Sequence, residues 1–141
     1  MGKRSGVVLV VALAAGVALT AGGCGGDSEV TASDLEGTWS GTLSGFEKSG
    51  YREAEVTWKI AQTRGNAFKA TPTWTEPDGS TGRSSPSNGY LEASENDFWV
   101  AGDDGYCRGE IEDDDELELI CLEAGATDDD KLAIGGTLER Q

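Results

Sequence analysis

Apolar and polar residues alternate along much of the chain. Leu35, Gly37, Trp39, Gly41 and Leu43 are separated by Glu, Thr and Ser residues. The same period of two returns, in full or in shorter pieces, over residues 54–60, 68–74, 90–94, 98–101, 106–111, 117–122 and 132–138. A period of two is typical of a strand with one buried face. The pattern predicts eight short strands and no helical segment after residue 26.

Turn-forming residues separate these stretches and favour antiparallel neighbours. Residues 64–66 and 103–105 contain the Gly and Asn or Asp of tight turns, and residues 77–89 predict one long irregular loop. Pro72 cannot donate to a ladder, which predicts a bulge or an open edge there. Because sequential strands usually pair and closure removes exposed edges, we expect an all-β domain over 35–141: a small eight-stranded antiparallel up-and-down barrel.

One predicted hairpin pairs two cysteines. When residues 106–111 and 117–122 are folded around Asp114, their apolar positions coincide and Cys107 lies opposite Cys121. Opposed strand residues are close enough for a disulfide after a small adjustment of twist. In an oxidising compartment we expect this bond to form and to have a structural role.

The first 26 residues have the composition of a targeting segment. Lys3 and Arg4 precede an apolar or glycine run at 7–19, and small residues lead to Cys24. This order predicts a signal peptide over 1–23, forming an apolar helix, and a flexible tether over 24–34. Ordinary secretion with the same cleavage site and an uncleaved anchor remain alternatives.

Cys24 after small residues resembles the lipobox of bacterial lipoproteins. That resemblance implies that the Cys24 sulfur carries a diacylglyceryl group and anchors the protein on the outer side of the cell membrane. It also accounts for the odd number of cysteines, since Cys107 and Cys121 pair with each other. The chain as a whole resembles small lipoproteins of actinobacteria.

Charge and composition narrow the chemistry. The formal net charge is −15 and there is no histidine. A nucleic-acid partner is therefore not expected, and Ser-His-Asp catalysis and histidine-based zinc sites are excluded. We expect no enzymatic activity, no cofactor and no metal. The acidic runs 113–115 and 128–130 could bind calcium, but they lack EF-hand spacing and favour solvated turns.

The Gly37-Thr38-Trp39 sequence resembles the Gly-x-Trp opening of the calycin superfamily, which contains lipocalin-like and avidin-like barrels. This resemblance implies that Arg140, on the last strand, lies across Trp39 and closes the barrel. Gly41 and Gly45 stand where the avidin-like branch carries polar groups that bind ligand. Biotin is therefore not the expected ligand.

Four large aromatic residues are predicted to face inward: Trp39, Trp58, Phe68 and Trp74. They could line a pocket for a small apolar ligand, or they could fill a barrel of this size. The alternative function is an acidic, inhibitor-like module that acts on a basic extracellular protein such as a lysozyme. Fold alone does not decide between these functions.

Overall fold

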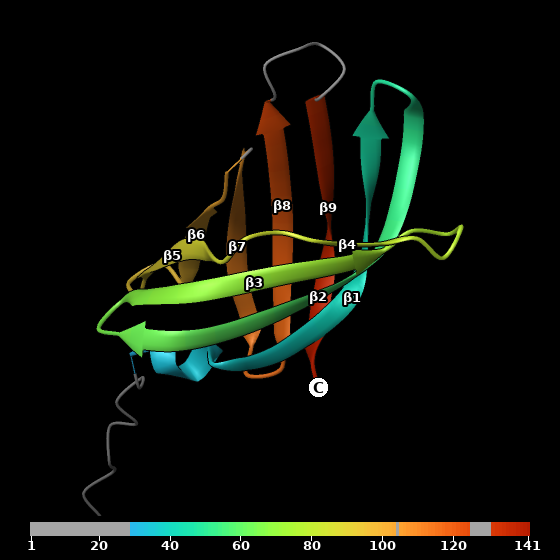
Figure 1. The fold of residues 1–141 in the computed structure, drawn as a ribbon. Helices are drawn as coiled ribbons and strands as arrows, with labels where there is room; N and C mark the ends of the chain where they lie inside the picture. The colour runs from blue at the N-terminus through green and yellow to red at the C-terminus, as the bar shows by residue number, and fades with distance from the viewer. Residues whose placement is uncertain (1–28, 104, 125–130) are drawn as a thin grey trace, which may run out of the picture.

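The computed structural model describes residues 29–103, 105–124 and 131–141 as nine strands and one short 3-10 helix (Figure 1). The predicted signal peptide and Cys24 lie outside the described residues. The elements are η1 (Ala32–Leu35), β1 (Gly37–Glu47), β2 (Gly50–Arg64), β3 (Ala67–Thr75), β4 (Thr81–Arg83), β5 (Ser87–Glu92), β6 (Asp97–Ala101), β7 (Gly105–Asp113), β8 (Glu116–Ala124) and β9 (Lys131–Arg140).

Eight of these strands close into an antiparallel barrel, as predicted. Going round the barrel, β1 pairs with β2, β2 with β3, β3 with β5, and each later strand with the next until β9 returns to β1. The additional strand is β4, which pairs only with β3. Neighbours in sequence are therefore neighbours in space nearly everywhere, which keeps the connections short.

One edge of β3 is shared by two strands. Residues Ala67 to Ala70 pair with β5, and Thr73 to Thr75 pair with β4. Pro72 lies in the gap between the two partners, which confirms the open edge predicted there. The prediction of a wholly irregular loop over 77–89 is wrong, because this segment contains β4 and the start of β5. The alternation of buried and exposed positions in β5 begins at Ser87. It is not visible in the sequence, because its first buried positions are Ser and Gly rather than large apolar residues.

The domain begins before the predicted boundary at residue 35. Thr31 donates to the Asp34 carboxylate through its hydroxyl (2.7 Å) and its backbone N–H (2.8 Å), which starts η1. The hydroxyl and then the backbone hydrogen bond hold the pKa of Asp34 below its ordinary value. Ala32 and Leu35 are fully buried. The last residues of the predicted 24–34 tether are therefore part of the fold.

The first and last strands are joined at the end of the barrel where η1 lies, here called the closed end. The Arg140 guanidinium lies 4.1 Å from the Trp39 ring centroid. It also donates to the backbone carbonyls of Glu36 (3.0 Å) and Asp34 (2.6 Å). The predicted contact between Arg140 and Trp39 is present, and its backbone hydrogen bonds add to the cation–π attraction.

Large buried side chains pack the closed end. Phe68 and Phe98 meet edge to face with their centroids 5.9 Å apart, a favourable aromatic geometry. Gly109 makes room for Phe98, because a Cβ at Gly109 would lie 2.0 Å from that ring. The largest fully buried side chains include Leu35, Trp39, Ile60, Leu91, Phe98, Leu117, Leu119 and Leu138.

Candidate functional site

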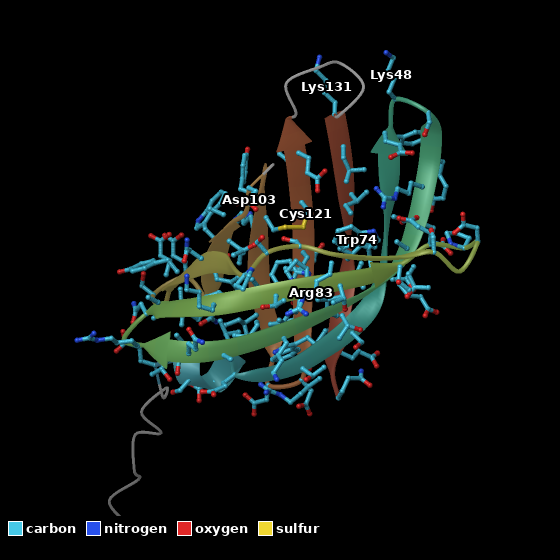
Figure 2. The ribbon with its side chains drawn as sticks, in the orientation of Figure 1. Lys48, Trp74, Arg83, Asp103, Cys121 and Lys131 are labelled. Atoms are coloured by element: carbon cyan, nitrogen blue, oxygen red, sulfur yellow. A yellow bond between two sulfur atoms is a disulfide. The ribbon has the colours of Figure 1, made fainter. Side chains whose placement is uncertain are left out.

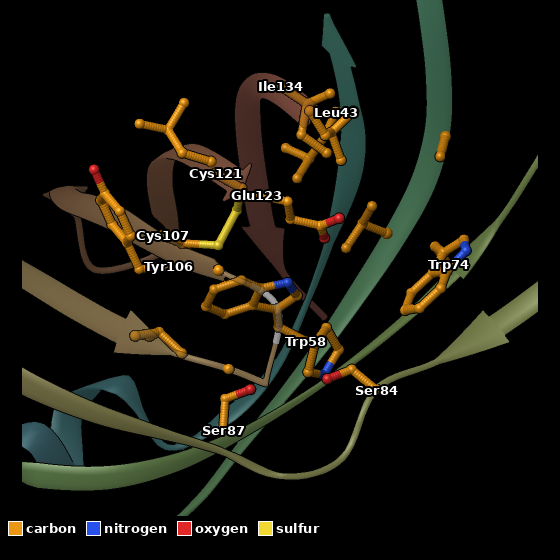
Figure 3. A pocket seen from close by; sticks show the side chains of 18 of the residues that line it. Leu43, Trp58, Trp74, Ser84, Ser87, Tyr106, Cys107, Cys121, Glu123 and Ile134 are labelled. Carbon is orange, nitrogen blue, oxygen red and sulfur yellow. A yellow bond between two sulfur atoms is a disulfide. The ribbon is translucent and has the colours of Figure 1, made fainter. Parts of the chain in front are cut away.

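The opposite end of the barrel, here called the open end, contains a cavity of about 440 Å³. In Figure 2, Lys48 and Lys131 extend from this end, away from η1. The cavity reaches inward between β1, β2, β3 and the strands β6 to β9. Its apolar wall consists mainly of Leu43, Ala54, Val56, Trp58, Val100 and Ile134 (Figure 3). This space exists because inward residues such as Ala54 and Val56 are small, whereas the inward residues of the closed end are larger.

Trp58 forms the floor of the cavity. It is the cross-strand partner of Trp39, and both side chains are almost completely buried, with 2% and 1% exposed. The Trp39 indole N–H donates to the carbonyl of Leu35 at 2.9 Å. Only Trp58 borders the cavity. The pair therefore marks the boundary between the filled and hollow parts of the barrel.

Trp74 lines one side of the mouth and is half-buried rather than fully inward. Its ring lies flat against Gly82 of β4: a Cβ at Gly82 would lie 2.2 Å from the indole. The segment of residues 76–86 therefore crosses the mouth in contact with this indole. A side chain at position 82 would push the indole away.

The disulfide forms part of the cavity wall. Cys107 and Cys121 are bonded, with their Cα atoms 4.0 Å apart, in the predicted register between β7 and β8. Both cysteines border the cavity, and Figure 3 shows the bond facing the same space as Trp58. The bond therefore fixes the wall of the cavity in addition to joining two strands.

The mouth is polar and carries charges of both signs. Arg52 forms an ion pair with Glu76, with a further Nε–Oε2 hydrogen bond of 3.2 Å, and lies 3.6 Å from Glu47. The Glu76 hydrogen bond, aided by the charges of Glu76, Glu47 and Glu123, raises the pKa of Arg52. Arg83, Asp103 and Glu123 complete the charged rim, and Ser84, Ser85 and Ser87 add hydroxyls.

The four residues predicted to bind ligand divide into two pairs. Trp58 and Trp74 border the cavity, whereas Trp39 and Phe68 belong to the packed closed end and do not reach it. The physical reason is depth: Trp39 lies under Arg140, and Phe68 packs against Phe98. The inward direction of Trp39, Trp58 and Phe68 is as predicted, but position along the barrel axis decides which aromatic residue borders the cavity.

Several lining residues were not identified from the sequence. Arg52 continues the inward series of Ala54, Val56 and Trp58, and Glu123 continues that of Leu119 and Cys121. Extending the period of two past the apolar residues would have placed both charges at the mouth. Ser87 gave no such signal, because it does not lie in a clear alternating series.

The chain matches no protein-family model and no curated protein. Among the residues that the structure describes, no helix is sufficiently long and apolar to span a membrane. The same residues contain no cluster of three or more Cys, Asp or Glu side chains arranged to hold a metal ion.

Proposed function

We propose that this protein is a non-enzymatic binding barrel that holds a small apolar ligand in its open-end cavity. The observation that carries this proposal is the cavity itself. Its volume of about 440 Å³ falls within the roughly 300–1,000 Å³ of small-molecule sites. Its walls are mostly aliphatic and aromatic and its polar groups gather at the mouth, an arrangement that favours a ligand inserted with its apolar part first.

The proposal is tested by filling the cavity. The uncharged dye N-phenyl-1-naphthylamine should gain fluorescence when it binds the wild-type domain. Ala54→Trp places a ring inside the cavity and should abolish this gain. Glu55→Trp places the same ring on the outer face of β2, one residue away, and should leave it unchanged. Equal dye binding by both variants would place the dye outside the cavity and refute the proposal.

We further propose that the barrel acts outside the cytoplasm, anchored to the cell membrane by lipid on Cys24. The segment before Cys24 and the Cys107–Cys121 disulfide support this, since disulfides persist in oxidising compartments. The test is the intact mass of protein extracted from its native membrane. A mass of residues 24–141 plus acyl chains is expected, rising by two hydrogens on reduction. Retention of residues 1–23, or an unacylated Cys24, would contradict the anchor.

A second candidate function is association with a basic extracellular protein, and the outer face of the barrel favours it. Five large apolar side chains gather there on neighbouring strands β5 to β8, with Trp99 and Tyr106 in ring contact at 6.0 Å. The β5–β8 patch consists of Tyr90, Trp99, Tyr106, Ile120 and Leu122, all exposed. Exposed apolar side chains that gather on one face are a feature of protein-interaction sites.

An acidic row borders the β5–β8 patch. Towards the closed end stand Glu92, Glu110 and Glu118, whereas Asp97 is buried and paired with Arg108, which lies between Trp99 and Ile120. Such a surface complements an apolar patch flanked by Lys or Arg. Ile120→Ser should weaken binding to a basic lysozyme, and Phe46→Ser, at a more exposed apolar position on β1, should not. Binding that is unaffected by Ile120→Ser, or insensitive to salt, would exclude this role for the patch.

A further inference from the structure

The indole N–H of Trp58 is a buried donor without a protein acceptor. Within residues 29–103, 105–124 and 131–141 it donates to no side chain or carbonyl, in contrast to the Trp39 N–H beside it. No fully enclosed side-chain nitrogen or oxygen in this part of the chain lacks a partner. The Trp58 N–H must therefore open onto the cavity that its ring borders.

A donor in this position is costly unless something accepts from it. A buried polar group that is left unpaired destabilises the structure that contains it. Trp58 is 2% exposed, and in Figure 3 its ring nitrogen is turned towards the pocket, on the side where Glu123 lies. A ligand that carries an oxygen acceptor at its buried end would satisfy this donor, and a pure hydrocarbon would not.

Charge at the mouth limits the ligand in a second way. Arg52 is already paired with Glu76 and Glu47, and the rim carries two further carboxylates, Glu123 and Asp103, and one further guanidinium, Arg83. The whole chain has a formal net charge of −15. The summed field therefore repels anions approaching the mouth.

We propose that the ligand is an uncharged, mostly apolar molecule with a carbonyl, ether or hydroxyl oxygen at its leading end, and that this oxygen accepts the Trp58 indole N–H. This inference rests on the proposed function, because it names the ligand class of the same cavity. Trp58 thus fixes the orientation of the ligand, while the aliphatic walls and Trp74 provide apolar contact area.

Three probes of one shape test the inference: 2-acetylnaphthalene has the acceptor, 2-ethylnaphthalene lacks it, and 2-naphthoate is an anion. The ratio of the hydrocarbon Kd to the ketone Kd is measured in the wild type and in Trp58→Phe. This comparison cancels the different hydration of the two probes. We expect the ratio to fall about fivefold in Trp58→Phe, the factor expected for one buried hydrogen bond.

Trp74→Phe is the matched control, because it makes the same truncation in the wall of the mouth. It should weaken both neutral probes together and leave their ratio unchanged. An unchanged ratio in Trp58→Phe would overturn the inference while leaving the proposed function intact. Tighter binding of 2-naphthoate than of the ketone would overturn the charge argument. Failure of all three probes to bind would refute the proposed function itself.

A measurement on the wild-type chain keeps the test valid if Trp58→Phe does not fold. The sequence has four tryptophans, which give resolvable indole N–H signals in a ¹⁵N–¹H spectrum. The ketone should move the Trp58 signal downfield, and the hydrocarbon should not. The Trp39 signal should stay in place, because its N–H is already bonded to Leu35. Equal Trp58 shifts with the two neutral probes would contradict the proposed hydrogen bond.

Discussion

The two ends of the barrel use the same strands and the same alternation, yet one is packed and the other hollow. At the closed end Phe68, Phe98 and Leu119 interdigitate, and Gly89 and Gly109 leave room for the phenylalanine rings. At the open end the inward positions of the same strands carry Ala54, Val56 and Val100, among others. The period of two therefore determines which side chains point into the barrel, whereas the volume of those side chains determines whether the interior is filled.

The polar groups differ in the same way. The Trp39 N–H and the Arg140 guanidinium both have backbone acceptors at the closed end. At the open end the Trp58 N–H faces the cavity, and Arg52 is held by carboxylates at the mouth. Buried polar groups that have hydrogen-bond partners make a structure more rigid. A buried donor without an acceptor in the protein can form a hydrogen bond with a ligand. Packed and hydrogen-bonded groups are therefore concentrated at the closed end, and the cavity that we propose as a binding site lies at the open end.

The largest expected effect comes from truncating one aromatic side chain at each end. Phe98→Ala should lower the free energy of unfolding by about 3–5 kcal/mol, because Phe98 is fully buried in a packed region. Trp74→Ala should cost less than half of this, since Trp74 is half-buried at the mouth, but it should weaken binding of the dye. Urea unfolding measures both. Equal losses of stability would refute the division between the two ends.

An intermediate effect is expected from the disulfide, which lies in the cavity wall. Replacing both Cys107 and Cys121 by Ala removes a crosslink between residues 14 apart, and the loop-entropy model gives a loss of about 3 kcal/mol. Thermal unfolding and dye titration of the same sample check it. We expect a lower Tm together with weaker dye binding. A lower Tm with unchanged affinity would show that the wall keeps its shape without the bond.

The smallest effect concerns charge on the outer face near the closed end. Burial and the neighbouring carboxylates of Glu110, Glu118 and Glu116 raise the pKa of Glu112 above its ordinary value. The ionised Glu112 therefore lowers the stability of the folded protein. This loss is fully present at pH values above the raised pKa and is absent at pH values below the ordinary pKa. Glu112→Gln should raise the Tm slightly at pH 7 and leave it unchanged near pH 3. A lower Tm at pH 7 would contradict the repulsion.

Much of the fold follows from the sequence because period two is a local property. The pairing of Cys107 with Cys121 followed from matching the apolar faces of one hairpin, and the structure has that register. The contact of Arg140 with Trp39 followed from the resemblance to calycin barrels, and it is present. Each of these features depends on a few residues whose spacing in the sequence is known. Neither requires an estimate of the volume of the side chains inside the barrel.

The cavity could not be derived in this way. Its existence depends on the summed volume of side chains from strands all around the barrel, and no local pattern reports that sum. Strand β4 was missed because Thr81, Gly82 and Arg83 show no apolar alternation; its place follows from Trp74 packing on Gly82. The η1 turn was missed because Thr31 and Asp34 were assigned to a polar tether. Their mutual hydrogen bonds become visible only in three dimensions.

The hydrogen bonds of Arg140 to the backbone of Asp34 and Glu36 have a consequence for the proposed membrane anchor. These bonds hold the end of β9 next to η1, where the described part of the domain begins. Both η1 and the C-terminal end of β9 therefore lie at the closed end (Figure 1). If Cys24 carries lipid, as we propose, the closed end would lie nearer the bilayer and the mouth would point away from it. Ligand exchange would then occur with the surrounding medium. A reporter fused after Gln141 would crowd the bilayer, whereas one inserted at the exposed turn of Asp78 and Gly79 would stand clear of it.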